Sequence, residues 1–269
     1  MTSVTIIGSS HVAALKTAWA RISAELSDRI SLRFFAAPQP AYGKLRLEPC
    51  GRYGLPADAD AKDAVTVEKV NGATSVDLNA AEHVVWVSQN SALTFCARLV
   101  NKLDVYGDGP AMERGTLVSR QAFSAFLGAH AERALPSAAW GQLKARLMVT
   151  LTPRLSETVT GSSDPTHRVV AQAAADGDRL QRALSQYEQA YAQALARNGH
   201  ALLPQPVDTL AANGLTAAAH CEGSVRLRDN SAHPAEDHAH MNTDFGERML
   251  RALFDRLAGA RAAAEHQMT

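Results

Sequence analysis

The sequence has few cysteines and no surplus of charge of either sign. Its three cysteines, Cys50, Cys96 and Cys221, are odd in number and far apart, and no C-x-x-C motif occurs. Reduced thiols therefore fit this pattern better than a disulfide framework. Lys plus Arg and Asp plus Glu both total 27, so the composition indicates no nucleic-acid partner.

The sequence also lacks a long hydrophobic run. No apolar segment approaches the ~20 residues that a membrane-spanning helix needs. The first apolar strand begins too early for the charged and apolar regions of a signal peptide to precede it. We expect a soluble, unprocessed, cytoplasmic protein without a membrane partner or a cofactor, and the composition leaves its oligomeric state open.

Strand and helix patterns alternate along the chain. A β-prone run at 4–7 is followed by an amphipathic helical pattern over 11–26 and by a second strand pattern over 30–38. A strand, a helix and a strand within about thirty residues are typical of a βαβ unit with parallel strands. Residues 39–64 are rich in glycine, proline and aspartate and predict a loop, with a short hairpin that continues into 64–78.

The rest of the chain continues this alternation. The strongest central strand is expected over 83–90, a continuous apolar run that ends in polar residues. Further strands are expected over 146–155 and 200–206, and helices over 119–135, 168–200 (interrupted near Gly177) and 244–265.

This order predicts an α/β fold, a flavodoxin-like three-layer α/β/α sandwich with a mainly parallel sheet of about five strands. At 269 residues the chain is expected to form a single domain over 1–269. We expect a loop and hairpin elaboration around 39–80 and a helical insertion around 92–145.

Ser10 lies in the stretch VTIIGSSHVAALK, residues 4–16, where the first strand gives way to the first helix. Free backbone amides and the helix dipole favour negative charge there, which suits a nucleophile. The same place suits a serine that caps the helix by accepting a hydrogen bond from one of its first amides. The stretch alone leaves both interpretations open.

A second polar motif stands ahead of the last expected helix. In AEDHAHMNTDFG, residues 235–246, Asp237 and His240 are three positions apart. A serine becomes a good nucleophile when a histidine takes its proton and a carboxylate orients that histidine. A solvated loop is the alternative, because the D-x-x-H pattern is short enough to occur by chance.

In combination, these motifs resemble those of the SGNH (GDSL-like) hydrolase family over nearly the whole chain. The first block is Gly8-Ser9-Ser10, similar to the G-N-S-H variant of some family branches, and the last block is the D-x-x-H motif. The resemblance implies a three-layer fold of the SGNH-hydrolase type with Ser10 as the nucleophile, His240 as the base and Asp237 as the residue that orients it.

The resemblance also implies an oxyanion hole. Its donors would be the Ser10 amide, the Asn90 side chain and the backbone amide of Ala36 or Gly43. Such a hole needs two or three donors aimed at the tetrahedral oxygen.

The chain departs from the family pattern at two of these positions. The usual Gly-x-Asn of the third block appears as Ser88-Gln89-Asn90, and Ala36 stands where the second block carries a glycine. His11, next to the nucleophile, is expected either to shape the pocket and bind substrate or to sit in the capping turn.

Metal and dinucleotide sites are poorly supported. GSSHVA lacks the glycines of G-x-G-x-x-G. Five potential zinc ligands fall close together but lack the paired short spacings of a structural site, namely His220, Cys221, His233, His238 and His240. We therefore expect no metal.

The sequence thus predicts a serine esterase or acyl hydrolase, and the substrate expected is a small-molecule or glycan ester such as an O-acetylated carbohydrate. Two alternatives remain: an acyltransferase with the same triad, and a non-catalytic binding protein on the same fold.

Overall fold

Five parallel strands form the centre of the protein. The structure is a computed structural model and describes residues 1–107 and 115–266. The strand order is β10-β9-β6-β1-β2, and every neighbouring pair is parallel. The bounds are β1 (Thr2–Gly8), β2 (Ile30–Ala36), β6 (His83–Asn90), β9 (Arg146–Leu151) and β10 (Ala201–Leu202). The predicted α/β class and five-strand parallel sheet are confirmed.

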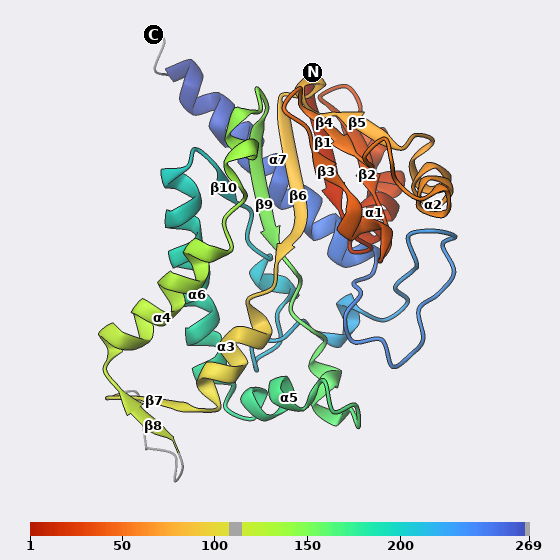
Figure 1. Cartoon of the computed structure of the whole chain (residues 1–269). Helices are drawn as coiled ribbons and strands as arrows, with labels where there is room; N and C mark the ends of the chain where they lie inside the picture. The colour runs from red at the N-terminus through yellow and green to blue at the C-terminus, as the bar shows by residue number, and fades with distance from the viewer. Residues whose placement is uncertain (108–114, 267–269) are drawn as a thin grey trace.

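Helices cover both faces of this sheet, because successive residues of a strand point to opposite sides. Ile6 and Val85 face the apolar cluster that contains α1 (Val12–Leu26) and α7 (Thr243–His266). Ile7 and Val84 face the cluster on the other side. That side carries α3 (Leu93–Val100), α4 (Arg120–Arg133), α5 (Arg168–Ala174) and α6 (Gly177–Arg197), and Figure 1 shows the two sets of helices on either side of the sheet.

Helices α1 and α7 belong to opposite ends of the chain and cross closely. Gly246 of α7 lies against α1, and a Cβ at this position would stand 2.0 Å from the Ala14 carbonyl oxygen. Only glycine permits such an approach without a shift of one backbone. This crossing brings the segment before α7 next to the end of β1.

The segment around 39–80 contains more regular structure than the sequence predicted. β3 (Arg46–Leu47) and β4 (Arg52–Gly54) form an antiparallel hairpin, and β5 (Ser75–Asp77) pairs with β4.

A helix, α2 (Ala61–Asn71), occupies part of the region in which the hairpin was expected to continue. The Asp60 side chain caps it by accepting a hydrogen bond from the Lys62 amide (2.7 Å), and Gly72, with a φ of 73°, ends it. These capping signals prevail over the β-branched residues in between.

The region around 92–145 contains α3 and α4, as expected for a helical insertion, together with two short strands that the sequence did not indicate. β7 (Leu103–Val105) and β8 (Thr116–Val118) pair in parallel. Within the described residues, no helix combines the length and the apolar composition needed to cross a bilayer. The single-domain prediction for 1–269 stays a prediction.

Candidate active site

Ser10 lies at the carboxyl edge of the sheet, where the strand order reverses. The chain leaves β1 for β2 on one side and returns to β6 on the other, and crevices form at such points in parallel sheets. Gly8 allows the end of β1 to lie against β6, since a Cβ there would stand 2.7 Å from the Val87 carbonyl oxygen. The Ser10 carbonyl accepts the Ala13 amide (3.0 Å), so the serine stands at the entrance to α1.

The side chain of Ser10 does not cap that helix. The N-cap residue of α1 is His11, which makes no side-chain capping bond. Ser10 Oγ instead lies 2.9 Å from Nε2 of His240. Ser119, the serine expected to begin the helix over 119–135, does cap α4, because its Oγ accepts the Ala122 amide (3.1 Å).

The structure brings together the three residues that the sequence assigned to a triad. His240 Nδ1 lies 2.8 Å from Oδ2 of Asp237, and its Nε2 faces Ser10. The other carboxylate oxygen of Asp237 accepts the backbone amides of Ala239 and His240, each at 2.9 Å. The D-x-x-H segment therefore forms a closed turn that holds the imidazole between the carboxylate and the serine.

Asp237 is ionised in this setting. Burial disfavours the charged carboxylate, but the hydrogen bonds from the two backbone amides and from His240 outweigh it and lower the pKa of Asp237 to about 2. A carboxylate bonded to Nδ1 selects the imidazole tautomer whose Nε2 carries a lone pair. Nε2 of His240 is therefore poised to accept the hydroxyl proton of Ser10.

Two further histidines surround His240. His233 Nδ1 lies 2.9 Å from the same Asp237 oxygen, and its ring stacks on His240 with centroids 3.9 Å apart. The His11 ring also stacks on His240, at 5.1 Å. The sequence suggested a pocket role for His11 but considered His233 only as a zinc ligand, although its position four residues before Asp237 is compatible with a shared turn.

The group formed by His233, Asp237 and His240 is also the set of side chains that could hold a metal ion. One ligand atom from each of the three lies within 4.8 Å of the others. Both Nδ1 atoms are, however, engaged by the carboxylate. A metal bound here would have to replace the hydrogen bonds that orient His240.

Three of the four predicted oxyanion donors already donate hydrogen bonds within the protein. Asn90 Nδ2 donates to the Tyr187 hydroxyl (2.5 Å). The Ala36 amide donates to Oδ1 of Asn71 (2.9 Å), and the Gly43 amide donates to the Pro40 carbonyl (3.1 Å).

The Ser10 amide differs from these three groups. Within residues 1–107 and 115–266, it donates no hydrogen bond to another group of the protein. It is therefore the predicted donor best placed to bind an oxyanion, and the roles of Asn90, Ala36 and Gly43 stay predictions.

Ser10 and His240 open onto a cleft with a volume of about 710 Å³. The cleft is lined by the turn after β2, the first turn of α2 and the loop before α7, and the lining includes Pro38, Gln39, Lys44, Lys62, Arg226 and Arg228. Clefts of several hundred Å³ are typical of sites for small molecules.

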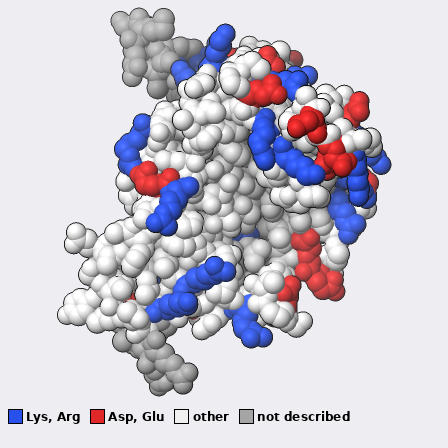
Figure 2. Space-filling view, in the orientation of Figure 1, with Lys and Arg blue, Asp and Glu red and all other residues white. Residues whose placement is uncertain are grey.

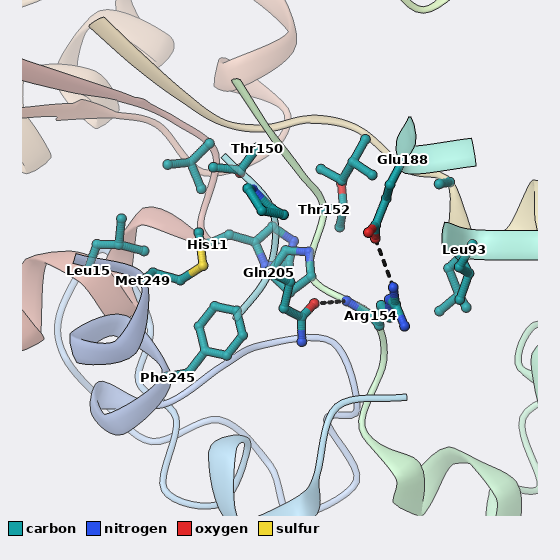
Figure 3. A pocket seen from close by; sticks show the side chains of 16 residues that line it. His11, Leu15, Leu93, Thr150, Thr152, Arg154, Glu188, Gln205, Phe245 and Met249 are labelled. Carbon is teal, nitrogen blue, oxygen red and sulfur yellow. Dashed lines mark hydrogen bonds and ion pairs between the residues drawn. The ribbon is translucent and has the colours of Figure 1, made fainter. Parts of the chain in front are cut away.

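A second, much smaller cavity lies behind His11. It has a volume of about 20 Å³, room for about one water molecule. Figure 3 shows His11, Leu15, Phe245 and Met249 at one end of it and the ion pair between Arg154 and Glu188 at the other. His11 thus lines this cavity rather than the cleft, and its predicted contact with substrate stays a prediction.

Comparison of the chain with models of known protein families, with curated proteins and with solved structures gave no match. The geometry of the site therefore has to carry the functional argument.

Proposed function

We propose that this chain is a serine ester hydrolase of the SGNH type that acts on small acyl esters. The observation that carries the proposal is the continuous hydrogen-bonded chain from Ser10 Oγ to His240 (2.9 Å) and from His240 to Asp237 (2.8 Å). Its position at the strand-order reversal, beside a cleft of about 710 Å³, is the place where an α/β protein binds its ligand.

The reaction follows from these contacts. Ser10 Oγ attacks the ester carbonyl as its proton passes to Nε2 of His240, and the Asp237 carboxylate stabilises the imidazolium that forms. The Ser10 amide donates to the oxyanion of the tetrahedral intermediate. The imidazolium then protonates the departing alcohol, and a water molecule, deprotonated by His240, releases the acid from Ser10.

The test compares two serines at helix starts. Ser10→Ala is expected to abolish both ester hydrolysis and labelling by a fluorophosphonate, with the melting temperature within a few degrees of wild type. Ser119→Ala, which removes a true cap, is expected to lower the free energy of unfolding by about 1 kcal/mol with activity retained. Retained hydrolysis in Ser10→Ala would overturn the proposal.

Acyl transfer is the nearest alternative, because an acceptor hydroxyl can replace water in the second step. Assays of an acetyl ester with and without a sugar acceptor separate the two reactions. Labelling without turnover of the ester alone, with turnover restored by the acceptor, would indicate a transferase. A wild-type protein that is neither labelled nor active would indicate a binding protein, and activity lost on chelation would indicate a metal at the histidine cluster.

A further inference from the structure

The walls of the cleft at Ser10 carry an excess of positive charge that the chain as a whole does not have. The whole sequence has a formal net charge of 0. Four cationic side chains line the cleft, Lys44, Lys62, Arg226 and Arg228, against two carboxylates, Asp60 and Asp63. In Figure 2 the side of the molecule that carries α2 shows lysine and arginine side chains close to aspartate and glutamate side chains.

Both carboxylates are already engaged by the protein. Asp63 is buried and forms an ion pair with Lys44. Asp60 accepts the backbone amide of Lys62 as the cap of α2. The two carboxylates are thus engaged at Lys44 and at the start of α2, and the four cations of the lining outnumber them by two.

Lys62 and Arg226 have no carboxylate partner within 4.0 Å in the part of the chain that the structure describes. Burial and the charge of His240 hold the pKa of His233 below its usual value against the opposing charge of Asp237, and Arg226 lies close enough for its charge to add to this lowering. Among the described residues, Arg228 forms an ion pair only with its chain neighbour Asp229, at 3.5 Å.

The cations reach the cleft from three segments that are far apart in the sequence. Lys44 ends the short helical turn Ala41–Lys44 after β2, Lys62 lies in the first turn of α2, and Arg226 and Arg228 lie in the loop before α7. Gathering like charges around one cleft destabilises a fold unless an anion sits among them. Such a convergence is typical of sites that bind an anionic ligand.

We propose that the ester substrate carries an anionic group, a carboxylate, phosphate or sulfate, which is held by Lys62 and Arg226 while its ester lies at Ser10. This inference rests on the proposed esterase function and specifies its substrate class. Exposed charge contacts are individually weak, so we expect the two together to change kcat/KM roughly tenfold.

The experiment uses pairs of esters that differ in charge alone. On the alcohol side, the meta-carboxylate of phenyl acetate is compared with its meta-carboxamide. On the acyl side, the p-nitrophenyl monoester of adipate is compared with the p-nitrophenyl ester of adipic acid monoamide. The proposal predicts that kcat/KM favours the anionic member of at least one pair, and the pair that responds shows which side of the ester carries the anion.

The variants then test the residues. Lys62→Gln/Arg226→Gln is expected to lower the ratio of anionic to neutral kcat/KM about tenfold, mainly through KM. The control Lys69→Gln/Arg168→Gln removes one exposed lysine from the last turn of α2 and one exposed arginine from α5, neither of which lines the cleft. This control should leave the ratio unchanged.

A competition assay gives a readout that does not depend on turnover. The phenol products of the first pair are tested for protection of Ser10 against a neutral fluorophosphonate, and stronger protection by the anionic phenol supports the proposal. If both phenols protect Ser10 equally, and if kcat/KM is equal for both members of each pair, the anionic substrate is overturned. The esterase proposal is unaffected by this outcome. Absence of both labelling and ester hydrolysis in the wild type overturns the esterase itself, and the substrate proposal with it.

Discussion

Asp237 accepts three hydrogen bonds, two from backbone amides to one oxygen and one from His240 to the other, and that second oxygen also lies 2.9 Å from Nδ1 of His233. The backbone bonds fix the carboxylate relative to its own turn, and the bond from His240 fixes that imidazole relative to the carboxylate. Its effect on the reaction can therefore be separated from its effect on the loop by a substitution that preserves shape.

Asp237→Asn is expected to lower kcat by about 10²–10⁴, because an amide neither stabilises the imidazolium nor selects the tautomer of His240. His240→Ala should reduce activity to background. Both are measured as initial rates of acetyl ester hydrolysis across about pH 6 to 9 with circular dichroism as a check on folding. A wild-type rate for Asp237→Asn would show that another group orients the histidine.

His11 links the site to acid stability. Burial, and then the charge of His240, lower the pKa of His11 from 6.5 to about 3, so the folded protein keeps this imidazole neutral. Between these two values the unfolded chain binds a proton that the folded chain does not. The free energy of unfolding must therefore fall as the pH falls through this range.

His11→Phe keeps an aromatic ring beside His240 and removes the titration. Between pH 7 and 5 the wild type is expected to lose about 2 kcal/mol more of its free energy of unfolding than the variant does. Urea unfolding at the two pH values measures this difference. His233 and Asp237 are present in both proteins, so the comparison isolates the titration of His11. Identical losses would show that His11 is accessible to protons in the folded state.

At the scale of the element, the site depends on how closely α7 approaches α1. Gly246→Ala places a methyl group against the Ala14 carbonyl and is expected to destabilise the protein by about 1–3 kcal/mol. It should also lower kcat, since α7 begins three residues after His240 and a shift of the helix moves the imidazole.

Gly259 provides the control on the same helix. It is exposed, and a Cβ there meets nothing within 4 Å. Gly259→Ala should therefore stabilise the helix by up to about 1 kcal/mol with unchanged activity. Thermal unfolding and ester hydrolysis of the two variants test the pair, and equal effects would show that the crossing tolerates a side chain.

The elements that the sequence predicted well are those whose signals are local. The apolar run over 83–90 coincides with β6, and the helical pattern after Ser119 coincides with α4. Helix α2 was missed because its β-branched residues outweighed, in a sequence reading, the capping residues at its two ends. The structure follows the caps.

The third block of the family pattern illustrates a different limit. The sequence has Ser88 where that pattern has glycine, yet Ser88 adopts a φ of 58° at a shift in the register between β6 and β9. A glycine would adopt this left-handed conformation more readily. The left-handed backbone therefore occurs at a serine, which does not indicate it in the sequence, and the Asn90 side chain is engaged by Tyr187, a partner that no local pattern reveals.

At the scale of the whole molecule, the meeting of Ser10, Asp237 and His240 was predictable from the sequence and the cleft was not. Ser10 and His240 belong to motifs fixed to a strand end and a helix start, so their meeting follows from the order of elements. Lys44, Lys62 and Arg226 follow no motif and no period, and they meet only because α2 and the loop before α7 pack beside the end of β2. Such convergence depends on tertiary packing, which a single sequence does not display.

The elements next to Ser10 and to the loop with Asp237 and His240 pack together in the core of the protein. β1 is a central strand, and α7 closes over the same apolar cluster as α1. The loop that carries Asp237 is anchored at both sides, by the hydrogen bond from the Ser156 amide to the His238 carbonyl (2.8 Å) and by Asn242, whose side-chain amide donates to the carbonyls of Ala219 (2.7 Å) and Glu222 (2.8 Å). These anchors leave the loop little freedom to open while the sheet stays intact.

Loss of the site should therefore coincide with loss of the fold. In urea at neutral pH, the midpoint for fluorophosphonate labelling of Ser10 is expected to equal the midpoint for loss of helical circular dichroism, as in a cooperative two-state transition of one domain. The single-domain prediction from the sequence also requires that the two midpoints coincide. If labelling is lost at lower urea while the helical signal is unchanged, the loop before α7 opens independently of the sheet, and the anchors at Ser156 and Asn242 contribute less than the hydrogen bonds imply.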